Sequence, residues 1–179
     1  MVQEEIKKKR KAIFLVGFNN WGKTILIREL FGHSRFWYER TYTIPGINSF
    51  FCVQSQSNDD VGQNYLGQIE RRFEGVRPQD PDLFTTICPS LEPGNHFIND
   101  ILYSPSIQRF SALHFLFLRY KWDHHAELLI ENIITSISNP MVSVPSYLHT
   151  IDADQGMALG DRLQAKTNQA MEQLRLIYS

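Results

Sequence analysis

Residues 17–24 combine the residue types and the spacing that suit a phosphate chain. In the segment Gly17-Phe-Asn-Asn-Trp-Gly-Lys-Thr24, four residues separate two glycines, and Lys and Thr follow the second glycine. The glycines let the backbone curl so that successive N–H groups point inward and form a nest for an anion. Lys23 adds a positive charge, and the Thr24 hydroxyl is able to ligate Mg²⁺. The segment therefore predicts a site for a polyphosphate with Mg²⁺.

This loop lies where a strand is expected to pass into a helix. Ala12 to Val16 form a continuous apolar run, which is typical of a strand buried on both faces. After the loop, apolar residues recur with helical spacing up to Gly32, a residue that commonly ends a helix; they are Ile25, Leu26, Leu30 and Phe31. The N-terminus of such a helix carries about half a positive charge, which would attract the same anion.

Four further apolar or β-rich runs predict strands, with helical spacing between them. The predicted strands span 49–54, 83–88, 113–118 and 147–151. The predicted helices span 60–73, a short segment ending at 102, a segment capped by Asp123 that runs to 137, and 158–177. Crossovers of this length join parallel strands with a right-handed turn. The pattern predicts an α/β fold: a three-layer sandwich with a five-stranded, mainly parallel sheet and helices on both faces.

Length and composition indicate a single domain, residues 1–179, with 42% hydrophobic residues. The net charge of −1 provides no global basic field, so no nucleic-acid partner is expected. No apolar run is long enough for a membrane span or for the core of a signal peptide. Cys52 and Cys88 lie in apolar runs and are too few for a disulfide scaffold, which favours the cytoplasm.

With this strand and helix order, residues 17–24 resemble the phosphate-binding loop of the P-loop NTPase superfamily. The resemblance covers the whole chain as a pattern but is residue-specific only in the loop. It implies the P-loop NTPase fold, with ATP or GTP and Mg²⁺ as ligands and Lys23 as a catalytic cation. The residues that it places around the nucleotide are Gly17, Phe18, Asn19, Asn20, Trp21, Gly22, Lys23, Thr24 and Ile25.

Two branches of the superfamily compete. Nucleoside and nucleotide kinases have a similar size and loop position, and Ile151-Asp-Ala-Asp-Gln155 resembles the motif near their base, which implies a contact from Asp152. GTPases carry N-K-x-D, which Tyr120-Lys-Trp-Asp123 resembles with Tyr in place of Asn. Small GTPases also present D-x-x-G on a strand paired antiparallel with its neighbour. Here a helix-length segment separates the second and third strands, so we rank a kinase above a GTPase.

Candidates for the metal carboxylate and the second cation lie at strand ends. Asp59 and Asp60 follow the second strand and could serve as metal partner or general base, and Glu92 follows the third and could bind the metal with Thr24. Helix capping or a solvated loop is the alternative for each carboxylate. Arg119 ends the fourth strand, where it could stabilise charge on a transferred phosphoryl group.

These features predict a Mg²⁺-dependent, nucleoside triphosphate-binding protein, with ATP ahead of GTP, that acts as a kinase-like phosphotransferase on a small-molecule acceptor. The first alternative is a GTPase-like nucleotide switch, or an NTP hydrolase, that acts through a protein partner. The second alternative is a nest for phosphate or sulfate without turnover.

Overall fold

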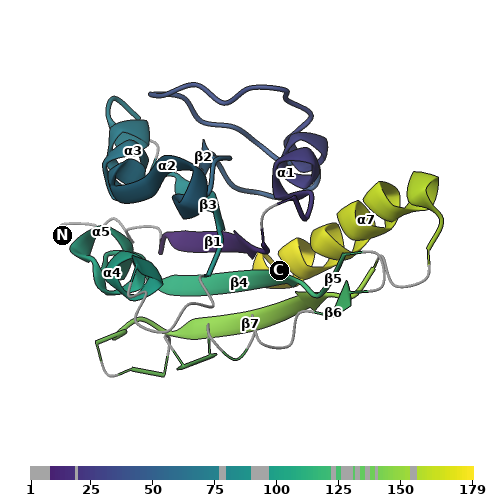
Figure 1. Cartoon of the computed structure of the whole chain (residues 1–179). Helices are drawn as coiled ribbons and strands as arrows, with labels where there is room; N and C mark the ends of the chain where they lie inside the picture. Colours follow the sequence, from purple (N-terminus) through teal and green to yellow (C-terminus); the bar gives the residue numbers. More distant parts are fainter. Residues whose placement is uncertain are drawn as a thin grey trace.

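A central parallel sheet organises the chain (Figure 1). The computed structural model describes residues 9–18, 20–76, 80–89, 97–121, 124–125, 131, 134–135, 138–139, 141–153 and 157–179. The five strands of the sheet are β1 (Lys11–Val16), β2 (Phe51–Gln54), β3 (Asp82–Ile87), β4 (Ala112–Leu118) and β7 (Ser146–Ile151). Their order is β2-β3-β1-β4-β7, and every neighbouring pair is parallel. The α/β class and the parallel sheet are therefore confirmed.

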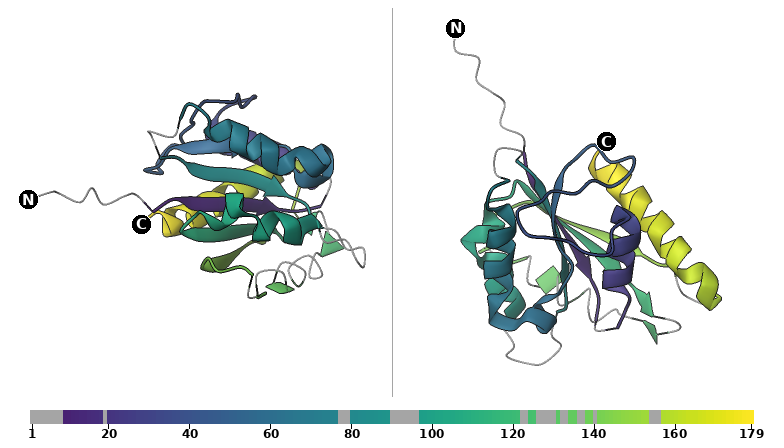
Figure 2. Two further views of the ribbon diagram at one scale, coloured as in Figure 1. Left: turned by 90° about the vertical axis from the view of Figure 1, so that its left-hand side faces the viewer. Right: turned by 90° about the horizontal axis from the view of Figure 1, so that it is seen from above.

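Helices cover both faces of this sheet. They are α1 (Lys23–Phe31), α2 (Asn58–Val61), the 3₁₀ turn η1 (Gly62–Asn64), α3 (Tyr65–Phe73), α4 (Phe97–Tyr103), α5 (Pro105–Gln108) and α7 (Leu159–Ile177). In the right-hand view of Figure 2, α1 and α7 lie on one side of the sheet, and α3, α4 and α5 lie on the other. In the described part of the chain, no helix has both the length and the apolar character needed to cross a membrane.

The alternation of side chains along β1 explains the two hydrophobic cores. Ala12, Phe14 and Val16 face the core beneath α3, α4 and α5, whereas Ile13 and Leu15 face the core beneath α1 and α7. Successive side chains of a strand point to opposite faces, and here both faces are covered. An uninterrupted apolar run is the sequence signature of such a strand, which is why β1 was predictable.

Two predicted helices differ from the structure. The helix expected at 60–73 is split into α2, η1 and α3, because Gly62 adopts a φ of 67° that a continuous α-helix does not contain. The helix expected after Asp123 is wrong at its start. There β6 (His124–His125) pairs antiparallel with β5 (Tyr120–Lys121), so these two histidines belong to a strand and not to a helix. Most of that predicted helix, including Asp123, lies outside the described residues.

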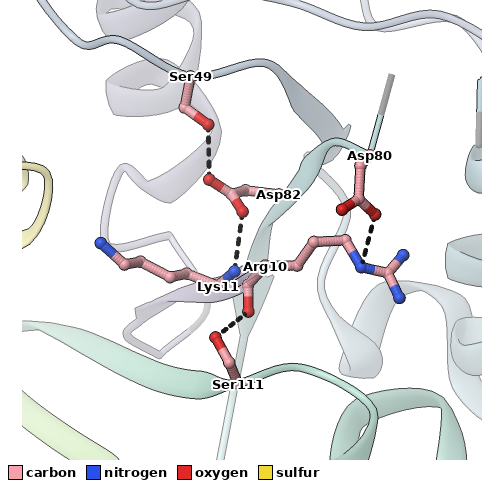
Figure 3. Close-up of polar contacts among 6 residues, drawn as sticks. All are labelled: Arg10, Lys11, Ser49, Asp80, Asp82 and Ser111. Carbon is pink, nitrogen blue, oxygen red and sulfur yellow. Dashed lines mark hydrogen bonds and ion pairs between the residues drawn. The ribbon is translucent and has the colours of Figure 1, made fainter. Parts of the chain in front are cut away.

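A buried carboxylate joins separate parts of the chain at the amino ends of the strands. Asp82 is fully buried and accepts hydrogen bonds from the Lys11 backbone N–H (2.8 Å), the Ser49 hydroxyl (2.6 Å) and the Tyr178 hydroxyl (2.8 Å). Figure 3 shows Asp82 lying between Ser49 and Lys11. Hydrogen bonds to a charged acceptor are stronger than neutral ones, so this cluster holds β1, β3, residue 49 and the end of α7 together.

The residue before β1 extends these contacts. Arg10 pairs with Asp80 through its Nε atom at 3.1 Å, and its carbonyl accepts hydrogen bonds from the backbone N–H and the hydroxyl of Ser111, both at 2.7 Å (Figure 3). These bonds connect the start of β1 to the segments that precede β3 and β4. The amino-end edge of the sheet is thus secured between neighbouring strands.

Candidate functional site

The loop at residues 17–24 follows the central strand at the carboxyl-end edge of the sheet. β1 lies between β3 and β4, and the Gly17 N–H donates to the Ile87 carbonyl at the end of β3 (3.2 Å). The helices that follow β1 and β3 cover opposite faces of the sheet, as Figure 2 shows. In open α/β sheets, ligands bind outside the carboxyl ends of strands at such a reversal. The loop therefore occupies the favoured position for a ligand.

The backbone of this loop turns through two left-handed residues. Asn20 has a φ of 61° and Gly22 a φ of 81°, and the Trp21 N–H donates to the Phe18 carbonyl at 3.3 Å. Left-handed residues within a turn allow neighbouring N–H groups to point toward one concave side. Gly22 is also the N-cap of α1, and no described side chain caps that helix. The first N–H groups of α1 are therefore available to a ligand.

A pocket of about 340 Å³ opens beside the loop. Its lining residues are Asn20, Trp21, Gly22, Lys23, Thr24, Ile25 and Asp60. The volume falls within the range of small-molecule sites, and the lining combines backbone amides, an ammonium, a hydroxyl and a carboxylate. The structure thus brings six of the residues predicted to bind the nucleotide together with Asp60, one of the predicted carboxylates.

Lys23 is buried beneath the loop, and both of its described hydrogen-bond acceptors are neutral. Its Nζ atom donates to the carbonyls of Gly17 (2.7 Å) and Phe18 (2.8 Å). Burial lowers the pKa of the ammonium, whereas Cys88, Asp59 and Asp60 lie close enough to raise it in part. Both acceptors are neutral carbonyls, so no described carboxylate is hydrogen-bonded to the Lys23 ammonium, and the group suits an anionic ligand.

Thr24 belongs to a small hydroxyl cluster at the ends of two strands. The hydroxyls of Thr24 and Thr86 both donate to the Ser55 carbonyl, at 3.4 Å and 3.3 Å. Ser55 follows β2, and Thr86 lies near the end of β3. Ser55 and Thr86 were not predictable from the sequence, because their hydrogen bonds join segments that are distant along the chain. The shared carbonyl fixes Thr24 at the edge of the pocket.

Asp60 of α2 has the helix-capping role that was considered beside a role in metal binding or catalysis. Ser57 is the N-cap, and its backbone N–H donates to the Asp60 carboxylate at 3.3 Å, while its hydroxyl donates to Asp60 at 3.2 Å. The same hydroxyl also bonds to Asp59. Ser57 and Asp60 thus form a capping box, in which Ser57 and not a carboxylate is the N-cap. The box leaves Asp60 in the lining of the pocket, where a second role is open to it.

The oxygen donors of the pocket fit Mg²⁺ better than a softer metal. Mg²⁺ usually takes one or two protein oxygens together with substrate phosphates and waters, and Thr24 and Asp60 supply such a pair. No group of three or more His, Cys, Asp or Glu within the described ranges could hold a metal by itself. A metal at this site would therefore depend on phosphate oxygens for its remaining ligands. Asn19 and Glu92, both predicted site residues, lie outside the described residues.

Arg119 and Asp152 meet each other rather than the loop. Arg119 directly follows β4, its Nη1 atom lies 3.4 Å from the Asp152 carboxylate, and its backbone N–H donates to the Ile151 carbonyl. Both side chains are partly exposed, and neither lines the pocket. Their predicted roles in charge stabilisation and base contact therefore stay predictions. Trp122 and Asp123 of the motif at 120–123 lie outside the described residues.

Asn58, which was not among the predicted site residues, connects α2 to the sheet. The side-chain amide of Asn58 donates to the Cys88 carbonyl at 2.9 Å and accepts from the Cys88 N–H at 2.6 Å. Cys88 follows β3, thirty positions along the chain from Asn58. The local sequence, an Asn before two Asp residues, contains no signal for a contact with a residue thirty positions away.

Comparison of the chain with protein-family models, with curated proteins and with solved structures found no match. The loop, the pocket and α2 are therefore the basis for assigning a function.

Proposed function

We propose that this chain binds a Mg²⁺–nucleoside triphosphate in the pocket beside residues 17–24 and transfers a phosphoryl group to a small acceptor. The observation that carries the proposal is the pocket lining, to which the first residues of the uncapped helix α1, Lys23 among them, and Asp60 all contribute. Backbone N–H groups and a cation suit phosphate oxygens, and a carboxylate beside a hydroxyl suits Mg²⁺. We accordingly propose the P-loop NTPase fold for the chain.

Each part of the site has a distinct role under this proposal. The N–H groups of the loop and of α1 bind phosphate oxygens, and the Lys23 ammonium neutralises the charge that develops during transfer. Thr24 and Asp60 hold Mg²⁺, which when bound neutralises further charge on the phosphates. The carbonyls of Gly17 and Phe18 hold the Lys23 ammonium beneath the loop that borders the pocket.

The pairing of β2 supports a kinase-like layout over a GTPase-like one. β2 runs parallel to β3, with Phe51 opposite Asp82 and Gln54 opposite Thr85. The resemblance to small GTPases implies an antiparallel pair at this place. We also propose a cytoplasmic location, because Cys52 and Cys88 form no disulfide although they are the two cysteines of the chain.

Trp21 provides the test, because it lines the pocket and reports on it by fluorescence. Trp37→Phe and Trp122→Phe remove the other two tryptophans. This variant is titrated with ATP, GTP and pyrophosphate, with Mg²⁺ and with EDTA. We expect saturable, Mg²⁺-sensitive binding of ATP that Lys23→Ala weakens by roughly 10- to 100-fold, the usual worth of a charge-assisted contact. Lys9→Ala, which removes an exposed lysine, serves as the matched control.

The same titration separates the alternatives. Tight binding of GTP and GDP with slow exchange would replace the kinase with a nucleotide switch that acts on a protein partner. Binding of pyrophosphate or phosphate with no preference for a nucleotide would indicate an anion site without turnover. Absence of any binding below millimolar concentration would contradict the proposed function in each of its forms.

A further inference from the structure

The Asn58 side chain is a two-ended connection between α2 and β3. Its Nδ2 atom donates to the Cys88 carbonyl (2.9 Å), and its Oδ1 atom accepts from the Cys88 N–H (2.6 Å). Asn58 is only 5% exposed, so water does not easily replace either bond. A buried amide that satisfies both backbone groups of one residue restricts translation and rotation between the two segments.

The connection matters because α2 is too short to hold its own position. The helix has four residues and is followed by Gly62 with a φ of 67°, so it does not continue into α3 as one rigid rod. A single turn of helix is marginal without tertiary contacts. Asn58 is its first residue, and Asp60 two positions later lines the pocket. The place of the Asp60 carboxylate therefore depends on how Asn58 is held.

Among the described residues at the carboxyl end of β3, which lies beside β1, none has a carboxylate side chain. Residues 86–89, which lead out of β3, read Thr-Ile-Cys-Pro. The carboxylate that lines the described pocket belongs to Asp60 of α2, a separate element. The Asn58 amide thus connects the carboxyl end of β3, whose residues 86–89 carry no carboxylate, to the helix that contains Asp60.

We infer that Asn58 is a positioning residue that sets the Mg²⁺ dependence of nucleotide binding by holding Asp60 in the lining of the pocket that Thr24 also lines. This inference rests on the proposed function. Loss of the amide frees α2 from β3 and leaves the Cys88 N–H and carbonyl without these partners. The Asp60 carboxylate then no longer keeps a fixed position relative to Thr24. The contacts from Lys23 and the loop amides stay in place, because they belong to β1 and α1.

The test compares Asn58→Ala with Gln108→Ala. Gln108 forms a similar two-ended connection away from the pocket: its amide donates to the Leu102 carbonyl (2.7 Å) and accepts from the Ser143 N–H (2.9 Å). The ATP dissociation constant is measured from Trp21 fluorescence with Mg²⁺ and with EDTA, and thermal unfolding is recorded in parallel. We expect the gain in affinity from Mg²⁺ to fall by about fivefold or more in Asn58→Ala. Binding in EDTA changes little, and Gln108→Ala keeps the wild-type gain.

The outcomes distinguish this inference from the function beneath it. If the wild-type chain does not bind ATP, the proposed function fails and the inference fails with it. If the wild-type chain binds ATP and the gain from Mg²⁺ is the same in Asn58→Ala, only the inference is overturned. An equal fall in Gln108→Ala would also overturn it, because the effect would then follow general destabilisation. If Asn58→Ala does not fold, the same measurement is made on Asn58→Ser, whose side chain is too short to bond both backbone groups of Cys88. The ratio of the ATP dissociation constants with EDTA and with Mg²⁺ then decides.

Discussion

A buried ionisable side chain lies at each end of the strands of the central sheet: Asp82 at the amino ends and Lys23 at the carboxyl ends. The partners of these two side chains differ. At the amino-end edge, Asp82 accepts three hydrogen bonds from residues of three separate segments. At the carboxyl-end edge, Lys23 donates to two carbonyls of its own loop and faces a pocket. A charge whose partners come from distant segments stabilises the fold. A charge with local neutral partners beside a cavity is available for a ligand.

The strongest test of this contrast is Asp82→Ala. It leaves the Lys11 N–H and the hydroxyls of Ser49 and Tyr178 without their shared acceptor in a buried site. We expect a loss of about 3 kcal/mol or more in the free energy of unfolding, measured by urea denaturation. ATP affinity, measured well below the unfolding transition, should stay near that of the wild type. A loss of affinity without a loss of stability would break the contrast between the edges.

A histidine pair between the two edges predicts a dependence on pH. His114 of β4 lies 3.1 Å from His149 of β7, which in turn contacts Gln173 of α7. Burial, with smaller contributions from His149 and Lys11, lowers the pKa of His114 to about 4, and burial also lowers the pKa of His149. The unfolded chain therefore binds protons near pH 6.5 while the folded chain resists protonation.

Stability should accordingly fall as the pH decreases from about 6.5 toward 4, by about 3 kcal/mol for His114 alone. Thermal unfolding across that range provides the measurement, and His114→Gln should flatten the profile. An unchanged slope in His114→Gln would show that other groups cause the dependence.

Tyr178→Phe removes one of the three donors to Asp82 and keeps the aromatic ring against Phe51. We expect a loss of about 1 kcal/mol, since Asp82 retains its bonds to Lys11 and Ser49. Urea denaturation beside Asp82→Ala measures the effect. In the double variant, Tyr178→Phe should add almost nothing to Asp82→Ala. Full additivity would mean that the hydroxyl of Tyr178 acts elsewhere.

The smallest effect on stability is expected at the opposite edge. Lys23→Met removes a buried ammonium together with its desolvation cost, and the loss of two carbonyl contacts offsets this gain. The free energy of unfolding should stay within about 1 kcal/mol of the wild type, whereas ATP affinity falls. A destabilisation as large as that of Asp82→Ala would assign Lys23 to the fold instead of the ligand.

The features that were predictable from the sequence are those set by local patterns. The apolar run at 12–16 and the spacing up to Gly32 were enough to locate β1, α1 and the loop between them. The split of the 60–73 helix was not predictable, because a glycine within helical spacing does not reveal its φ. The contacts of Asn58 with Cys88 and of Arg119 with Asp152 depend on strand order, and local spacing contains no information about it.

The contact between Tyr178 and Asp82 also affects how the protein is made. The ribosome adds Tyr178 ninety-six residues after Asp82, so β3 is synthesised long before this partner exists. Until then the Asp82 carboxylate lacks the Tyr178 hydroxyl as a donor, so we expect a sheet that forms earlier to be less stable than the complete one. Synonymous codon changes that slow translation of α7 would lengthen that period and increase aggregation during expression.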